Sequence, residues 1–250
     1  MATSNHNSMS LFLDRLLRRS CLTDADQQAV LNLKSHAHQV EARRDIVRPG
    51  EKVSHATLVV NGLAARFDQM RDGRRQFTAL HLAGDMCDLH STVAPVAGWG
   101  IEALTTTTVL YVPHSELTAL VARNPSIALA FWRDTTADAS ILAKWVGNLG
   151  RRDARSRMAH LLCELGMRME QAGLGTRTCY ALHATQEQLS DVLGLTAVHV
   201  NRTLQALRAD GLVRVENRTV HVDNWQLLAD AAEFDETYLL VAPFAEQRAA

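Results

Sequence analysis

A predicted helix at residues 196–208 carries polar side chains that suit nucleic-acid recognition. Four of them lie off its apolar face: His199, Arg202, Thr203 and Gln205. Side chains of these types hydrogen-bond to base edges in the major groove of DNA or to backbone phosphates. The pattern therefore predicts a surface that reads duplex DNA.

Two short helices joined by a glycine turn must position this surface. Leu189, Val192 and Leu193 recur at helical spacing, and Thr185 stands where an N-cap is expected. Gly194 then permits a tight turn, because it has no β-carbon. The second helix is expected to bury three apolar residues: Val200, Leu204 and Leu207.

Two short alternating runs follow, at residues 212–215 and 219–222, and predict a β-hairpin. A helical hairpin followed by a β-hairpin is typical of a winged helix-turn-helix. The same arrangement could be purely structural, and a partner-binding scaffold that uses the acidic segment 225–240 is a further alternative.

The charge of the chain is unevenly distributed. The formal net charge is −1. Residues 150–222 nevertheless contain ten arginines against seven acidic residues, whereas the chain from Asp223 onward has six acidic residues and one arginine. A moderately basic module in a neutral protein suits specific DNA binding with limited nonspecific affinity.

The composition predicts a soluble globular protein with room for two modest domains, since 47% of the 250 residues are hydrophobic and 21% are charged. No apolar run approaches a membrane span, and the first residues lack the features of a secretory signal. We expect a cytoplasmic protein without a membrane partner.

The sequence offers no metal site and no catalytic motif. Its four cysteines are far apart and form no C-x-x-C pair: Cys21, Cys87, Cys163 and Cys179. A nucleophile elbow, a P-loop and an HExxH motif are all missing from the sequence. We therefore expect free thiols, no metal and no enzymatic activity.

Residues 40–112 have the texture of a compact antiparallel roll, with β-branched runs between evenly spaced turn signals. The expected strands are residues 57–60, 63–67, 76–82 and 106–112. Short helices are expected before the roll, at residues 11–19 and 24–34, after a frayed tail of ten residues.

Residues 126–149 predict one long helix, and Gly147 and Gly150, which flank Asn148-Leu149 at its end, predict a hinge to the DNA-binding domain. Six residues recur at alternating four- and three-residue steps, as in a coiled-coil seam: Phe131, Thr135, Asp138, Leu142, Trp145 and Leu149. The seam favours a homodimer; the alternative is a helix packed on the roll of its own chain. The predicted division is a sensor domain at 1–122, a dimerisation helix at 123–149 and a DNA-binding domain at 150–250.

This α+β order of roll, long helix, hinge and winged helix resembles the Crp/Fnr family, which includes the cyclic-AMP receptor protein. The resemblance covers residues 37–222 and rests on short motifs in the same order: Arg48-Pro49-Gly50-Glu51, Asn61-Gly62, Gly84-Asp85, Val146-Gly147-Asn148-Leu149, and Val200-Asn201-Arg202. It implies a bacterial, homodimeric transcription regulator that binds a palindromic promoter site on double-stranded DNA, with RNA polymerase as a further partner.

The resemblance also implies roles for individual residues of the helix-turn-helix. Arg202 matches an arginine that contacts guanine or phosphate in the family. Thr196 and His199 match positions that reach phosphates or base edges, and Val198 could contact a thymine methyl group. Seven residues form the expected DNA-binding set: Thr185, Gln186, Thr196, Val198, His199, Arg202 and Gln205.

The ligand-binding motifs of the family's cyclic-AMP binders are altered in this chain. Family members that bind the nucleotide use a Gly-Glu pair and, about ten residues later, an Arg-Ser pair. Here the corresponding elements are Cys87-Asp88 and Trp99-Gly100, and no arginine lies between Arg75 and Arg123. The candidate effector pocket consists of Arg66, Met86, Cys87, Asp88, Leu89, Trp99 and Leu142. Burying a phosphodiester without a cation is costly, so we expect an effector other than cyclic AMP, or none.

Other sensor chemistries of the family remain alternatives. Cys21 stands alone near the N-terminus, where the iron–sulfur relatives have several cysteines. His81 and His90 lie on either side of Met86-Cys87-Asp88-Leu89 and are conceivable haem ligands. Cys87 is a conceivable thiol sensor. The sequence therefore names no cofactor, and a regulator gated by cyclic AMP, another small ligand, haem or redox state stays open.

Overall fold

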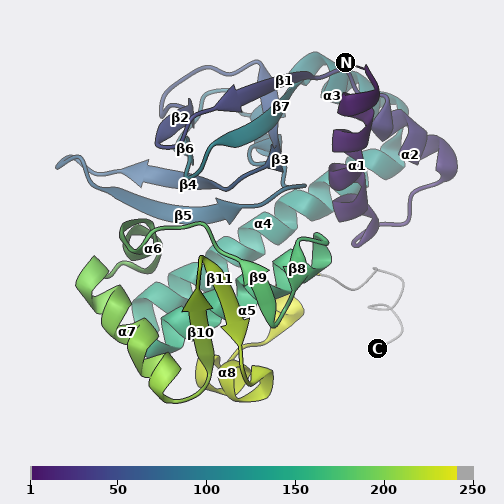
Figure 1. Ribbon diagram of the computed structural model, residues 1–250. Helices are drawn as coiled ribbons and strands as arrows, with labels where there is room; N and C mark the ends of the chain where they lie inside the picture. Colours follow the sequence, from purple (N-terminus) through teal and green to yellow (C-terminus); the bar gives the residue numbers. More distant parts are fainter. Residues whose placement is uncertain (1, 241–250) are drawn as a thin grey trace.

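Alternating apolar residues in the N-terminal half fold into two antiparallel sheets. In the computed structural model, which describes residues 2–240, the strand orders are β1-β7-β3 and β2-β6-β4-β5 (Figure 1). Val59 of one sheet and Ile101 of the other belong to the same buried cluster, so the sheets close over a common core. The strands are β1 (His36–Val40), β2 (Arg44–Val47), β3 (His55–Asn61), β4 (Ala64–Gln69), β5 (Arg75–His81), β6 (Gly100–Ala103) and β7 (Thr107–Pro113).

The predicted antiparallel roll is confirmed, although the sequence indicated only four of its strands. Strand β1 was missed because four of its five residues are exposed, and β2 and β6 are only four residues long. The predicted turn at Asn61-Gly62 is present. A β-carbon at Gly62, whose φ is +97°, would lie 2.7 Å from Oγ1 of Thr107, so this turn requires glycine.

Helices cover one end of the roll. They are α1 (Ala2–Leu17), α2 (Asp24–Leu31), the 3₁₀ turn η1 (Leu89–Thr92) and α3 (His114–Arg123). The expected frayed tail was wrong for residues 2–10, which form the start of α1. Met9 and Phe12 of this helix are buried, and the Phe12 ring lies 5.7 Å from that of Phe131.

The long helix α4 (Pro125–Arg151) runs past the roll and into the C-terminal half (Figure 1). It continues through Gly147 and Gly150, so the predicted glycine hinge was wrong. The chain instead turns at Arg152, and Asp153 caps the next helix, α5 (Ala154–Gln171), by accepting a hydrogen bond from Ser156 N at 2.8 Å.

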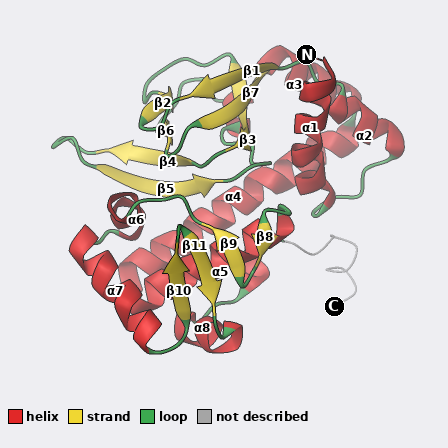
Figure 2. Cartoon of the chain, in the orientation of Figure 1, coloured by secondary structure: helices red, strands yellow, loops and turns green. Residues whose placement is uncertain are grey.

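The C-terminal half wraps helices around a small four-stranded sheet of order β10-β11-β9-β8 (Figure 2). Its remaining elements are β8 (Gly175–Thr176), β9 (Cys179–Ala181), α6 (Gln186–Leu193), α7 (Ala197–Ala209), β10 (Val213–Glu216), β11 (Thr219–Val222), α8 (Trp225–Ala232) and η2 (Glu236–Leu239). Phe77 and Leu104 of the roll share one apolar cluster with Leu189 and Leu193 of α6. The two halves are therefore packed directly on each other.

Candidate nucleic-acid interface and effector region

The helix-turn-helix is assembled from local signals that the sequence displays. Thr185 Oγ1 accepts a hydrogen bond from Gln188 N at 3.1 Å, and Gln188 Oε1 accepts one from Thr185 N at 2.8 Å, which forms a capping box at the start of α6. Gly194 ends α6 in the left-handed conformation, with φ of +61°. Thr196 then caps α7 by accepting from His199 N at 3.2 Å.

One stripe of α7 packs inward. Val200 and Leu207 are buried and Leu204 is half-buried, as predicted. The placement of Thr203 on the outer face was wrong. Thr203 is buried in the same stripe, and its Oγ1 donates to the carbonyl oxygen of His199 at 2.8 Å, so it satisfies its own helix rather than a ligand.

The outer face of α7 presents the predicted recognition side chains to solvent. The exposed residues are Thr196, Val198, His199, Arg202 and Gln205. Val198 has 71% of its surface exposed, which is unusual for an aliphatic residue on a helix. Arg202 forms no ion pair with any residue of the described chain, so its guanidinium is available to a partner.

The wing adds a cationic tip that the sequence analysis missed. Glu216 pairs with Thr219, which leaves Asn217 and Arg218 as a two-residue loop, and both have positive φ angles, of 49° and 61°. This is the geometry of a type I′ hairpin turn, and it holds Arg218 exposed at the tip. The Arg218 carbonyl accepts from Leu182 N at 2.7 Å, which ties the wing to the segment before α6.

Thr185 and Gln186 are exposed at the N-terminus of α6, a few residues after Leu182, which bonds to the wing. The predicted DNA-binding residues thus lie on exposed surfaces at the starts of α6 and α7, and the wing tip extends the same domain. The predicted hairpin strands left three residues between them, Glu216, Asn217 and Arg218, and this short loop was the signal that could have identified Arg218.

Three residues of the candidate effector pocket, Met86, Cys87 and Leu89, are packed in the apolar interior. Met86 and Leu89 lie in the apolar cluster that α1, α3 and α4 build against the roll, and Cys87 lies in the core between the sheets. Burial raises the pKa of the Cys87 thiol well above its ordinary value, which opposes a thiolate sensor. These three side chains therefore pack in the interior, and their assignment to a ligand pocket stays a prediction.

Asp88 is occupied by the backbone of the roll. Its Oδ1 accepts from Thr57 N at 2.6 Å, and its Oδ2 has no hydrogen-bond partner among the residues that the structure describes. Burial raises the pKa of this carboxyl to about 7. Asp88 therefore faces inward and does not extend a carboxylate to a ligand as the family's glutamate does.

Arg66 of β4 places a cation inside the roll, although no arginine follows the Cys87-Asp88 element before Arg123. Its side chain is buried, Nε donates to Thr78 Oγ1 at 3.3 Å, and the guanidinium carbon lies 5.2 Å from the Trp99 ring centroid. The Trp99 ring also lies 4.9 Å from that of His90. Burial lowers the pKa of Arg66, and the Trp99 ring covers it as a cation–π partner.

Burial lowers the pKa of both histidines that were considered as haem ligands, His81 and His90. Burial lowers the pKa of His81 to about 3, and it lowers the pKa of the half-buried His90 as well. His81 is therefore neutral near neutral pH. Leu142, the last member of the predicted pocket, is half-buried on α4.

Three members of the predicted dimer seam of α4, Phe131, Asp138 and Trp145, contact the interior of their own subunit, whereas Thr135 is exposed and Leu142 and Leu149 are half-buried. Phe131 is buried against Phe12, and Trp145 is buried and donates from Nε1 to Glu164 Oε2 at 2.9 Å. Asp138 accepts from Arg15 Nη2 at 3.1 Å. The seam as predicted was therefore wrong for these positions, because the roll, α1 and α5 already cover them.

A different stripe of α4 is exposed and has the same alternating spacing. Its members are Leu129, Trp132, Thr136, Ala139, Ala143, Val146 and Gly150. Trp132 and Val146 expose 72% and 63% of their surfaces. An apolar stripe with three- and four-residue steps is the pattern of a helix that packs against another helix.

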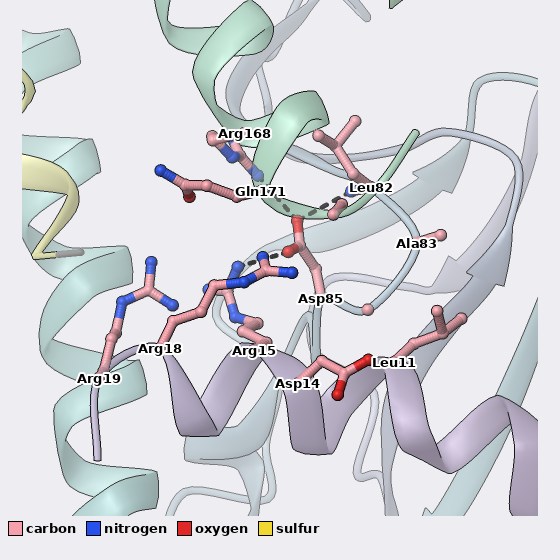
Figure 3. Close-up of a pocket in the computed structure, with 12 residues that line it drawn as sticks. Leu11, Asp14, Arg15, Arg18, Arg19, Leu82, Ala83, Asp85, Arg168 and Gln171 are labelled. Atoms are coloured by element: carbon pink, nitrogen blue, oxygen red, sulfur yellow. Dashed lines mark hydrogen bonds and ion pairs between the residues drawn. The ribbon is translucent and has the colours of Figure 1, made fainter. Parts of the chain in front are cut away.

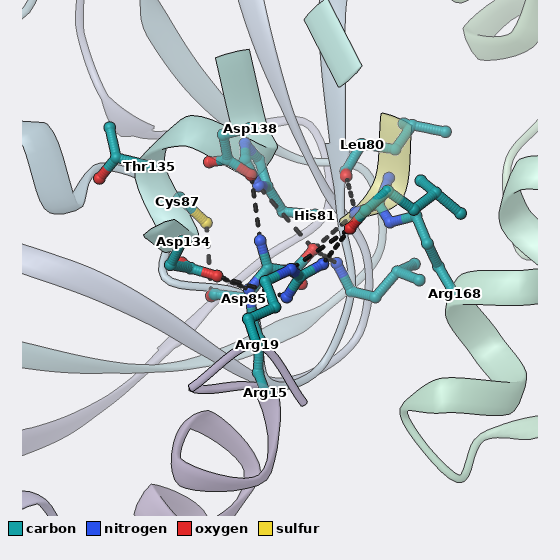
Figure 4. A network of polar contacts seen from close by, with 12 residues as sticks. Arg15, Arg19, Leu80, His81, Asp85, Cys87, Asp134, Thr135, Asp138 and Arg168 are labelled. Carbon is teal, nitrogen blue, oxygen red and sulfur yellow. Dashed lines mark hydrogen bonds and ion pairs between the residues drawn. The ribbon is translucent and has the colours of Figure 1, made fainter. Parts of the chain in front are cut away.

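A buried ion network, which the sequence analysis missed entirely, joins four elements (Figure 4). Arg15 of α1 donates to Asp85 at 2.5 Å and to Asp134 of α4 at 2.6 Å. Arg168 of α5 donates to the other oxygen of Asp85 at 2.7 Å. Burial alone would raise the pKa of Asp85, but Arg15 and Arg168 outweigh it and lower that pKa to about 2.

Two family models match the chain in the order of these two halves. The cyclic nucleotide-binding domain matches residues 37–124, and the Crp-like helix-turn-helix domain matches residues 156–231. The chain belongs to the Crp/Fnr family.

Crp/Fnr relatives align over most of the chain. The transcriptional activator protein FnrL of Cereibacter sphaeroides is 26% identical over 219 residues, which cover 84% of this chain and 86% of that protein. The structure of FixK2 from Bradyrhizobium japonicum is 28% identical, covers 80% of this chain and 98% of its own, and superposes with a TM-score of 0.73. A CooA variant from Carboxydothermus hydrogenoformans shares the fold, with a TM-score of 0.66 at 22% identity.

As a member of the Crp/Fnr family, the chain is a DNA-binding transcription regulator, and its matched relatives are transcription regulators rather than enzymes. Within residues 2–240, no group of three or more histidine, cysteine or acidic side chains is arranged to hold a metal ion. Over the same residues, none of the helices combines the length and the apolar character needed to cross a membrane.

Proposed function

We propose that the protein is a homodimer that binds a palindromic DNA site and inserts one α7 helix per subunit into successive major grooves. The observation that carries this proposal is the exposed, unpaired Arg202 at the centre of an exposed recognition face. Thr196, His199 and Gln205 surround it as further hydrogen-bonding groups, and Arg218 offers a phosphate contact from the wing.

Arg202→Ala tests the reading of DNA bases. We expect a loss of about 1–3 kcal/mol on a selected site and a relaxed sequence preference, as measured by fluorescence anisotropy at fixed salt. Arg71→Ala, an exposed arginine in the β4–β5 turn, is the matched control. An equal loss on the selected site and on random DNA would show that Arg202 holds phosphate only.

The exposed stripe of α4 is the proposed dimer interface. Two copies of the stripe would bury Trp132 and Val146, which water now contacts, and its small residues allow two helices to approach closely. Val146→Glu should shift the protein toward a monomer in sedimentation velocity. Val93→Glu, at an 87% exposed valine of the roll, is the control; a dimer that persists in Val146→Glu would place the interface elsewhere.

We also propose that DNA binding does not require cyclic AMP. Asp88 is engaged by Thr57 N, Leu142 has no hydroxyl group to offer an adenine, and the Arg66 guanidinium is covered by Trp99. Anisotropy with and without cyclic AMP should give equal affinities. Binding only with cyclic AMP would favour the alternative of a ligand-gated regulator in which Arg66 leaves Trp99 and pairs with the phosphate.

Contact with RNA polymerase is proposed for the segment at residues 172–178, between α5 and β9, where Leu174 exposes 42% of its surface. Leu174→Ala should lower activated transcription in a purified system while DNA affinity stays unchanged. Unchanged transcription would remove this loop from the polymerase contact.

A further inference from the structure

A recess between α1 and α5 contains hydrogen-bond donors that have no acceptor. It lies against the turn at residues 82–85, and Figure 3 shows Arg18 and Arg19, which follow the end of α1, on one side and Gln171 of α5 on the other. The space enclosed within it is about 30 Å³, and the recess opens to solvent. The recess is separate from the roll interior that holds Arg66 and Trp99.

The carboxylates at the base of the recess already accept hydrogen bonds from arginines. Asp85 Oδ1 accepts from Arg15, and Asp85 Oδ2 accepts from Arg168 at 2.7 Å and from Leu82 N at 2.8 Å. Asp134 accepts from Arg15 at 2.6 Å and lies 3.6 Å from Arg19 Nη1. These oxygens cannot neutralise further cations.

Two donor groups beside them have no acceptor in the described part of the chain. Arg18 is half-buried, and its guanidinium forms no hydrogen bond or ion pair with any residue in the described part of the chain. Asp14, an exposed acid of α1, acts on this guanidinium only through space. Gln171 Nε2 is buried without a partner among the described residues. Arg19 donates Nε and Nη2 to the Leu239 carbonyl, and burial and Arg15 lower its pKa to about 10.

We propose that this recess binds a small polyvalent oxyanion, with Arg18 as its main ligand and Arg19 and Gln171 as supporting donors. A planar guanidinium matches two oxygens of a phosphate or carboxylate group, and the acceptor oxygens would satisfy the Gln171 amide. Such an anion bridges the turn after α1 and the end of α5, so it ties the N-terminal segment to the DNA-binding domain. The binding step is independent of the proposed function; only an effect of the anion on DNA affinity rests on it.

Isothermal titration of the full chain with pyrophosphate and, separately, with citrate tests the site at matched ionic strength. We expect saturable binding that Arg18→Ala weakens about tenfold or more, because a charge-assisted contact is lost. Gln171→Leu should weaken it less, and Arg71→Ala should leave it unchanged. Tighter binding of pyrophosphate identifies a phosphate-bearing ligand, and tighter binding of citrate identifies a carboxylate.

Equal affinities in Arg18→Ala and Arg71→Ala, or no saturable binding of either probe, would overturn the proposal. Thermal unfolding without ligand confirms that each variant is folded, and Arg18→Lys, which keeps the charge but loses the planar fork, should bind with intermediate affinity. DNA affinity is measured separately. A chain that binds pyrophosphate but not DNA retains this site and refutes only the proposed function.

Discussion

Asp88→Asn should stabilise the protein in a manner that depends on pH. Asp88 is buried, its Oδ1 accepts from Thr57 N, and its Oδ2 has no hydrogen-bond partner among the described residues. Asparagine has the same shape, and its Oδ1 can still accept from Thr57 N. The substitution therefore removes the ionisable group while it keeps the hydrogen bond.

The magnitude follows from the pKa of this carboxyl, which burial raises from 3.8 to about 7. The folded protein holds the proton more tightly than the unfolded chain, so stability is lost as pH rises from about 4 through 7 and stays low above it. Linkage gives a loss of about 1.7 kcal/mol at pH 5 and about 4 kcal/mol at pH 8. The stabilising effect of Asp88→Asn should thus grow by about 2.5 kcal/mol between these two pH values.

Urea unfolding of the wild type and the variant at pH 5 and pH 8 measures this difference directly. Asp68→Asn, at an exposed position of β4, is the control and should show no such trend. A difference that stays constant between the two pH values would refute the reasoning, since it would mean that Asp88 does not titrate in this range.

Three further predictions concern the core and the wing. Arg168→Ala should lower the free energy of unfolding by about 3–5 kcal/mol, because it leaves Asp85 and Glu164 buried with fewer partners; urea unfolding would contradict this with a loss below about 1 kcal/mol. Gly100→Ala should cost about 1–3 kcal/mol in thermal unfolding, because its β-carbon would overlap the Phe67 ring, and an unchanged midpoint would mean that this ring moves freely. Arg218→Ala should weaken specific and random DNA alike and reduce the salt slope by about 1, whereas a loss confined to the specific site would make Arg218 a base-reading residue.

The helix-turn-helix was predictable because its determinants are local. Thr185, Gly194 and Thr196 act on residues within four positions of themselves, as caps and a turn, and the apolar spacing identifies the buried face. The misplacement of Thr203 shows the limit of this reasoning, since a threonine at the edge of an apolar stripe can be buried once its hydroxyl bonds to the preceding turn.

The dimer seam was not predictable from spacing alone. Helix α4 carries two stripes with alternating three- and four-residue steps, one that contains Phe131 and Trp145 and one that contains Trp132 and Val146. Spacing shows that each stripe can pack but not what covers it. The first is covered by α1, the roll and α5, which are distant in sequence, so only the tertiary structure leaves the second stripe exposed.

The buried ion pairs could not be predicted either, because their partners are distant in sequence. They also fix how the two halves of the chain are packed on each other. Arg168 reaches Asp85 across 83 positions of the chain, and Gln76 Nε2 of the roll donates to the Asp191 carbonyl of α6 at 2.6 Å. The covalent joint between the halves is short, because α4 runs to Arg151 and Asp153 already caps α5. A rotation of α7 about this joint must therefore separate the Arg168–Asp85 pair and expose two buried charges. Because that separation is costly in a low-dielectric interior, the orientation of α7 relative to the roll is determined by these contacts and not by flexibility at the predicted glycines.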